Sequence, residues 1–434
     1  RRGGRAYISL NVANNNPLSW TEKWNIDNSL AGFNELGQSW SKVSLVKFRV
    51  SSSSSKSIGI FGGGYDAGGT DGIDPDGVDS MGRGIFFIDI SQPETSTGFI
   101  IKKFTYSSTP TDPTYAMQYA VPCEPLILTD DYGYLSGVYF SDLGGQIWHV
   151  AYSNSSYTWG SPRLVFKANP GSNAGSGNSG GSLISSDDGR KMFYAPTGTY
   201  LGNCNYVDGD DEARDSESIV LMVGTGDREQ PMETDIHDRI YMIVDDAAAT
   251  LDERNLLNVT HDELDVDSTL SASERETLYG TLAETYGWYI KLDAIIDSYS
   301  HVGEKVLAQP TIFYGIGYIP TFTPNATDPC FPHGEAKIYG LNYCDGTAGL
   351  NYYKGNDTES GGVYSKKYDY RDRYRTMGEA IPSSPEIIIR DGVAAAFSSV
   401  GGGLPGLGEE GSSKIPQPNL SIDMINWRCL SGNR

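Results

Sequence analysis

Short apolar runs separated by glycine-rich turns recur along the chain. Five of them share one pattern, in which most copies carry an aromatic residue in the second position. They are residues 7–11, 85–89, 147–151, 240–244 and 338–342. Runs of this length, rich in β-branched and aromatic residues, predict β-strands.

Most of these strands follow another strand that ends in a turn containing glycine. The turns are Phe61-Gly62-Gly63-Gly64, Ser141-Asp142-Leu143-Gly144-Gly145 and Val223-Gly224-Thr225-Gly226-Asp227. Strand, turn and strand together form a hairpin, and hairpins recurring about every 60 to 100 residues favour four-stranded blades with long insertions. We therefore predict an all-β fold, a β-propeller with five visible hairpin repeats. A β-sandwich is the alternative that the same strands permit.

The two ends of the chain suggest how such a propeller closes. Residues 394–403 resemble the penultimate strand of a blade that lacks its outer strand, and residues 5–12 form a strand that could supply it. Pairing of strand 5–12 with the strand near 394–400 would remove two exposed sheet edges. We predict one propeller domain over residues 1–434, closed in this way.

Residues 247–286 depart from the strand pattern. Leucines are spaced among many acidic residues, and Ser271-Ala272-Ser273-Glu274 is typical of a helix start. We interpret this region as a helical insertion from one blade. It forms either a solvated cover or, alternatively, a partner-binding element.

Composition narrows the class of protein. The 33 basic and 55 acidic residues give a net charge of -22, which repels nucleic acid and anionic membrane surfaces. The 52 glycines and 28 tyrosines favour many short strands.

No apolar stretch reaches the roughly 20 residues of a membrane span. The chain opens inside a strand-like segment without a signal peptide, so we expect a fragment of a longer precursor.

The five cysteines, Cys123, Cys204, Cys330, Cys344 and Cys429, are too far apart in sequence for a zinc ribbon or a redox pair. In an oxidising compartment, Cys330 and Cys344 would close the shortest loop, and we expect a disulfide between them, with one cysteine left over. Two buried free thiols are the alternative.

An ordered set of motifs resembles the C-terminal domain of the PilY/PilC family of type IV pilus tip and biogenesis proteins. One of them is Ser141-Asp142-Leu143-Gly144-Gly145-Gln146-Ile147-Trp148. The set comprises residues 1–7, 36–41, 61–66, 141–148, 223–229, 287–290, 303–307, 321–325, 328–330 and 381–385. Each motif is short, but in order they span nearly the whole chain.

The resemblance implies a modified propeller of about seven blades. It also implies a protein at the pilus tip or the outer membrane surface of a Gram-negative bacterium. There it would associate with minor pilins, act in pilus extension or against retraction, and adhere to host or abiotic surfaces. A free-standing surface adhesin is a second interpretation.

Family members that this chain resembles carry a calcium loop before the strand leading into the Gly-Asp-Leu turn. Here residues 128–136 place Leu128 and Tyr132 at ligand positions, and only Asp130 is a good ligand. Two other loops are richer in carboxylates. The calcium candidates are Asp74, Asp76 and Asp79 in residues 71–79, with Asp71 near enough to add a fourth ligand, and Asp208, Asp210 and Glu212. The first set ranks higher, because Pro75 and Gly77 favour a compact turn. Solvated acidic loops are the alternative.

A quinoprotein dehydrogenase is the enzymatic alternative, because its propeller repeats end in similar glycine turns. Enzymes that resemble this repeat often stack the quinone against a disulfide of adjacent cysteines, and here no two cysteines are neighbours. The histidines, His149, His237, His261, His301 and His333, form no zinc-hydrolase spacing. We name no catalytic residue and predict a non-enzymatic protein.

Overall fold

The structure is a computed structural model of the chain. It describes residues 4–12, 16–66, 78–169, 189–202, 204, 214–246, 249–265, 268–292, 302–325, 333–360, 363–390, 393–400 and 412–414. The chain divides into two compact units. Unit 1 contains Arg1–Val165, Lys191–Ala195 and Trp427–Arg434, and unit 2 contains Phe166–Arg190 and Pro196–Asn426.

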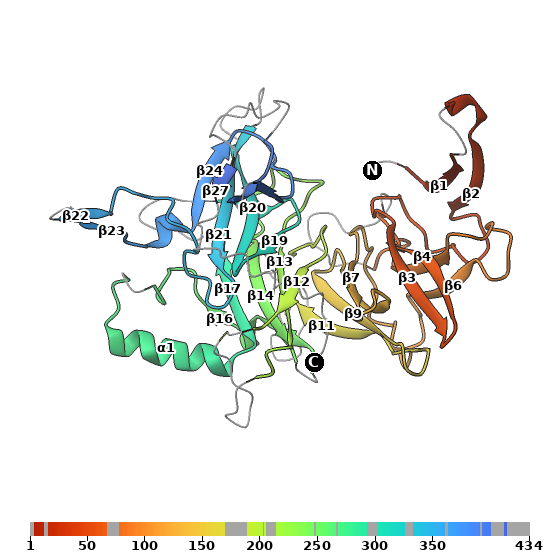
Figure 1. The fold of residues 1–434 in the computed structure, drawn as a ribbon, viewed down its shortest axis with the longest axis horizontal. Helices are drawn as coiled ribbons and strands as arrows, with labels where there is room; N and C mark the ends of the chain where they lie inside the picture. The colour runs from red at the N-terminus through yellow and green to blue at the C-terminus, as the bar shows by residue number, and fades with distance from the viewer. Residues whose placement is uncertain are drawn as a thin grey trace. The chain divides into compact units, whose positions relative to one another are not determined.

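Unit 1 consists mainly of antiparallel strands (Figure 1). A hairpin of β1 (Ala6–Asn11) and β2 (Thr21–Asp27) encloses the 3-10 turn η1 (Pro17–Ser19). A four-stranded sheet follows, made of β3 (Ser44–Ser51), β4 (Ser54–Gly62), β5 (Gly84–Asp89) and β6 (Ile100–Thr105). The next sheet comprises β7 (Leu126–Thr129), β8 (Leu135–Ser141), β9 (Gln146–Ser153), β10 (Thr158–Trp159) and β11 (Arg163–Lys167).

Strand β5 is the most buried strand of the four-stranded sheet. Successive side chains of a strand point to opposite faces. Ile85 and Phe87 therefore join a core shared with β8 and β9, whereas Phe86 and Ile88 join a core shared with β1 and β2. Both faces of the sheet are covered, and every residue of β5 is buried.

Unit 2 is built around two larger sheets. The first contains β12 (Thr197–Tyr200), β13 (Ile219–Gly224), β14 (Arg239–Asp245), β17 (Gly287–Lys291) and β16 (Leu257–Asn258). The second contains β18 (Lys305–Val306), β20 (Ile316–Asn325), β21 (His333–Asn342) and β24 (Tyr374–Gly378), with β19 (Thr311–Phe313) paired to β20.

Smaller elements complete the described part of unit 2. Strand β15 (Leu251–Asp252) runs parallel to Phe166 and Lys167, the last residues of β11, which belong to unit 2, and it leads into the 3-10 turn η3 (Glu253–Asn255). The remaining elements are the hairpin of β22 (Thr358–Ser360) and β23 (Val363–Ser365), the 3-10 turn η4 (Tyr370–Asp372), and a sheet of β25 (Glu386–Arg390), β26 (Val393–Phe397) and β27 (Ser412–Lys414).

The helix α1 (Ala272–Glu284) begins at the capping motif identified in the sequence. Ser271 Oγ accepts a hydrogen bond from Glu274 N, and Ser271 N donates to Glu274 Oε2 at 2.8 Å. Among the described residues of the range 247–286, this segment alone is α-helical, and β15 and β16 lie in the same region. No helix of the described residues is long and apolar enough to cross a membrane.

The five predicted repeat strands are confirmed as β1, β5, β9, β14 and β21. The predicted glycine turns follow β4, β8 and β13, and these strands pair antiparallel with β5, β9 and β14. In the first turn, Gly64 has φ +98°, and a Cβ built there would lie 2.0 Å from Gln38 O. Glycine is required at that point.

The pairing predicted for the chain ends is not among those of the described strands. Strand β1 pairs with β2, and β26 has β25 on one edge and β27 on the other. Sequence alternation identified these strands but not their partners, because any two amphipathic strands satisfy the same pattern. Closure of a single domain stays a prediction.

Candidate functional site: an apolar groove and buried polar networks

Of the six predicted calcium ligands, only Asp79 is among the described residues. Asp74, Asp76, Asp208, Asp210 and Glu212 lie outside them. Asp79 is 1% exposed, and its Oδ2 accepts a hydrogen bond from Ala120 N at 2.6 Å. This contact fixes the end of the predicted loop to the segment before β7. The described residues contain no group of three or more His, Cys, Asp or Glu side chains placed to hold a metal ion.

Asp130, in the loop that resembles the family's calcium loop, is bound by protein donors. Its Oδ1 accepts from Tyr132 N at 3.0 Å and from Tyr134 N at 2.9 Å, and its Oδ2 accepts from Asn154 Nδ2 at 2.9 Å. These bonds shape the turn between β7 and β8, as Asp side chains commonly do in tight turns.

Asp142 organises the glycine turn between β8 and β9. Its Oδ1 accepts from Gly144 N and Gln146 N at 3.0 and 3.1 Å, and its Oδ2 accepts from Trp148 Nε1 at 2.9 Å. Burial raises the pKa of Asp142 to about 8, against the effect of these three donors. With no exposed surface, the carboxyl cannot reach a substrate, and we assign it a structural role.

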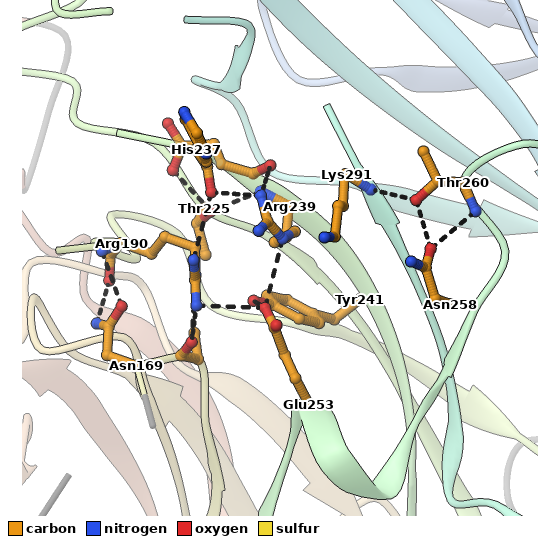
Figure 2. A network of polar contacts seen from close by, with 12 residues as sticks. Asn169, Arg190, Thr225, His237, Arg239, Tyr241, Glu253, Asn258, Thr260 and Lys291 are labelled. Atoms are coloured by element: carbon orange, nitrogen blue, oxygen red, sulfur yellow. Dashed lines mark hydrogen bonds and ion pairs between the residues drawn. The ribbon is translucent and has the colours of Figure 1, made fainter. Parts of the chain in front are cut away.

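A buried polar network in unit 2 centres on Glu253 (Figure 2). Its Oε1 lies 3.3 Å from Arg190 Nη2 and 3.5 Å from Arg239 Nε, and Tyr241 donates its hydroxyl to the same oxygen. The two arginine side chains are 1% and 3% exposed, whereas that of Glu253 is 17% exposed. The carboxylate therefore compensates two buried cations that would otherwise be costly.

Arg190 also joins two segments of unit 2. Its guanidinium donates to Ala168 O, while Asn169 Nδ2 donates to Arg190 O at 2.8 Å and Arg190 N donates to Asn169 Oδ1 at 2.9 Å (Figure 2). These contacts satisfy the backbone groups of a buried segment that lies outside regular structure.

A second carboxyl in this network holds the turn after β13. Thr225 Oγ1 donates to Asp238 Oδ1 at 2.7 Å and accepts from Arg239 N at 2.9 Å. Burial raises the pKa of Asp238 to about 6, and the charge of Lys305 acts in the opposite direction. Within the described residues, each of these groups is directed at protein partners. The network therefore fixes β13 and β14 rather than offering a reactive centre.

The predicted disulfide between Cys330 and Cys344 is wrong, because Cys344 is bonded to Cys204. Their Cα atoms are 5.3 Å apart, within the usual range for a disulfide. Tyr343 donates its hydroxyl to Leu201 O at 2.9 Å and so holds the two segments together, although 140 positions separate the cysteines. Cys123 is a buried free thiol, and burial raises its pKa to about 12, which leaves it unreactive.

A groove of about 870 Å³, lined by apolar and polar side chains, runs along the β1–β2 hairpin of unit 1. Ile8, Leu10 and Val12 of the first strand line it and are 56%, 48% and 57% exposed. Leu45 of β3 also lines the groove and is 66% exposed. Contiguous exposed apolar surface of this kind marks interaction sites.

The hairpin is anchored by its other face. Tyr7 packs on Phe61 with ring centroids 4.5 Å apart and donates its hydroxyl to Ser41 O at 2.8 Å, while Trp24 is buried against Phe99. Among the described strands, β1 has β2 as its one partner. Strand β1 was predicted from the sequence, but its hairpin with β2 was not. The signal for β2 is the alternation of Trp24 and Ile26 in residues 21–27.

Comparison with known proteins gives a fold relationship. No family model matches the chain, and no curated protein matches it in sequence. Among solved structures, it is similar to the C-terminal domain of PilY1 from Pseudomonas aeruginosa, with a TM-score of 0.54 and 15% sequence identity. The match covers 92% of this chain and 78% of that domain. This likeness confirms the predicted fold class: the chain has the fold of the PilY1 C-terminal domain.

Proposed function

We propose that this chain acts at the bacterial cell surface as a non-enzymatic factor associated with type IV pili. The observation that carries the proposal is the fold likeness to the PilY1 C-terminal domain over 92% of the chain. The ordered motifs that resemble the PilY/PilC family point the same way. In this role the chain promotes pilus extension or opposes retraction, and it contributes to adhesion.

The bond between Cys204 and Cys344 supports a location outside the cytoplasm. Structural disulfides form and persist in oxidising compartments, including the periplasm and the cell surface. A pilus tip or the outer membrane surface of a Gram-negative bacterium satisfies this condition. The net charge of -22 is also compatible with a surface-exposed protein that does not bind nucleic acid.

The buried polar groups support a binding role over catalysis. Asp142, Glu253 and Asp238 are engaged by donors of the protein itself, and those donors hold turns and strands in place. By contrast, the groove along β1 presents apolar side chains to solvent. Minor pilins are the partners that we propose for the chain as a whole.

Co-purification tests the pilus role directly. A tagged full-length chain is expressed in cells from which its gene has been deleted, and proteins that co-purify from the cell envelope are identified by mass spectrometry. We expect minor pilins in the eluate, and we expect the deletion to reduce the number of surface pili seen by electron microscopy. Normal piliation in the deletion strain, with no pilin recovered, would reject the proposal.

An enzymatic assay on the same purified chain separates the alternatives. Pyrroloquinoline quinone and calcium are added, and reduction of a dye is followed with a range of alcohols and sugars. We expect no turnover above the protein-free control. Turnover would favour a quinoprotein enzyme, whereas cell adhesion without pilin binding would favour a free-standing adhesin.

A further inference from the structure

Lys337 and Glu304 form a buried ion pair within the second sheet of unit 2. The Nζ atom of Lys337 lies 2.8 Å from Glu304 Oε2, and the two side chains are 2% and 0% exposed. Glu304 directly precedes β18, Lys337 lies in β21, and β20 is paired to both of these strands. The ion pair therefore joins two strands that are not neighbours in the sheet.

An amine and a carboxyl group held in this way are the two reactants of an amide. Two charges removed from water are costly, whereas an amide is neutral, so condensation relieves the cost of burying the pair. Well-oriented groups in one molecule also react as if at effective concentrations of about 10⁵ M or more. Because Cδ carries Oε2, the lysine nitrogen lies next to the carbon with which it reacts.

Two threonines of β20 distinguish the two oxygens of the Glu304 carboxyl group. Thr321 Oγ1 donates to Oε1 at 2.6 Å, and Lys337 Nζ donates to Thr323 Oγ1 at 3.2 Å. A donor at Oε1 stabilises negative charge that develops there when a nucleophile adds to Cδ. Oε2, which faces the amine, is then the oxygen that leaves.

Glu335 supplies a proton acceptor beside the amine. Its Oε2 lies 3.8 Å from Lys337 Nζ, and its side chain is 47% exposed, so it can exchange protons with solvent. Thr376 Oγ1 donates to Glu335 Oε1 at 2.9 Å and orients this carboxylate. A base is needed here, because a fully protonated nitrogen has no lone pair with which to attack.

We propose that Lys337 and Glu304 condense to an intramolecular isopeptide bond, with Glu335 as the base. The ion pair is the state before the reaction. One proton passes from Nζ to Glu304 Oε2, which leaves a neutral amine and a neutral acid. The Nζ–Cδ bond then forms, a second proton passes from Nζ to Glu335, and negative charge collects on Oε1.

The reaction ends with the loss of one water molecule. Glu335 returns its proton to Oε2, the Cδ–Oε2 bond breaks, and the oxygen leaves with both protons while the carbonyl re-forms at Oε1. Nζ keeps one proton, and no oxidant or other reactant is consumed. The product is a covalent cross-link between β21 and the residue before β18. This inference does not depend on the pilus role.

Mass spectrometry of the full-length chain, denatured and with its disulfide reduced, tests the bond. We expect the wild-type mass to be lower than that of its sequence by one water molecule. Proteolysis should then release a branched peptide in which Glu304 is joined to Lys337, and fragmentation of that peptide locates the link. Lys337→Arg keeps the positive charge but lacks the reactive amine, so its mass should equal that of its sequence.

Glu335→Gln and Glu379→Gln form a matched pair that tests the role of the base. Both replace an exposed glutamate of unit 2, and Glu335 is the one beside the Lys337 amine. Loss of a general base should slow condensation by about a hundredfold or more. Freshly purified Glu335→Gln should therefore keep the water that the wild type and Glu379→Gln have lost.

The wild-type measurement alone can overturn the proposal. A mass equal to that of the sequence would do so, as would a loss of water that maps to residues other than Glu304 and Lys337. Condensation of Glu335→Gln at the wild-type rate would overturn the assignment of Glu335 as the base.

Discussion

The Lys337 ammonium lies 2.8 Å from the carboxylate of Glu304, and the two side chains are 2% and 0% exposed. Thr321 Oγ1 donates to the other carboxylate oxygen at 2.6 Å. This pair joins β21 to the residue just before β18. An ion pair removed from water in this way is stable only while both partners are present.

Replacing Lys337 by methionine should therefore destabilise unit 2 strongly. The substitution leaves Glu304 buried without its cation, and breaking a buried pair costs about 3–5 kcal/mol in the free energy of unfolding. Urea unfolding followed by tryptophan fluorescence measures the change. Lys366→Met, at an exposed lysine, is the matched control, and an equal effect of the two variants would contradict the assignment.

Removing the disulfide should lower stability by about 2–5 kcal/mol, because the bond closes a long loop and restricts the unfolded chain. The variant carries both Cys204→Ser and Cys344→Ser. Thermal unfolding is recorded with and without reductant. Reductant should lower the melting temperature of the wild type and leave that of the variant unchanged. If reductant does not change the melting temperature of the wild type, the disulfide is not stabilising.

Because the pKa of Asp142 is raised in the folded chain, its contribution to the free energy of unfolding depends on pH. Its pKa is about 8 in the folded chain and close to 4 when unfolded, so between these values the folded state binds more protons. The stabilising contribution is full below pH 4 and declines as pH rises towards 8. Asp142→Asn removes this titration.

We therefore expect the free energy of unfolding of the wild type to fall relative to that of Asp142→Asn as the pH rises from 5 to 8. Urea unfolding of both proteins at several pH values measures it. The informative quantity is how this difference in unfolding free energy changes with pH. The variant also loses one acceptor oxygen, but that loss changes the difference by the same amount at every pH. A difference that stays constant over this range would show that Asp142 is already ionised.

Gly64 and Gly133 form a matched pair for testing the glycine turns. Both have positive φ, +98° and +76°, but a Cβ on Gly64 would meet Gln38 O at 2.0 Å, whereas nothing lies within 4 Å of one on Gly133. Gly64→Ala should destabilise unit 1 well beyond the roughly 1 kcal/mol that we expect from backbone strain alone in Gly133→Ala. Equal unfolding free energies would contradict the close packing of the first turn.

Calcium binding remains to be tested at Asp74, Asp76 and Asp79. Calcium takes six to eight oxygens, and this loop supplies several carboxylates within a few residues. Isothermal titration calorimetry should detect binding by the wild type and by Asp130→Asn, and lose it with Asp74→Ala combined with Asp76→Ala. Binding that survives the double substitution would exclude this loop.

Local features of the fold could be predicted from the sequence, and long-range ones could not. The strands around Ile85, Ile147 and Ile240 were identifiable because alternation and a preceding glycine turn are local signals. The helix start at Ser271 was identifiable because its cap lies within four residues. The disulfide partner of Cys344 was not, because the proximity of Cys204 is set by contacts between distant segments, such as that of Tyr343 with Leu201.

The groove along β1 could not be predicted from the sequence either. Residues 5–12 were correctly interpreted as a strand, but the same alternation is compatible with any sheet edge. What distinguishes β1 is its bulged pairing with β2 and the packing of Tyr7 on Phe61, which leaves Ile8 and Leu10 facing outwards. No pattern within residues 5–12 encodes that choice of face.

The bond between Cys204 and Cys344 also limits how far the chain can be stretched. A force applied to the two ends passes through the sulfur atoms, so the segment between the two cysteines, which lie 140 positions apart, cannot be drawn out even if its sheets are lost. Extended, such a segment would lengthen the chain by about 480 Å, at roughly 3.4 Å per residue. Under tension, the disulfide therefore keeps strands β13, β14, β17 and β20, together with α1, inside a closed loop that cannot be extended.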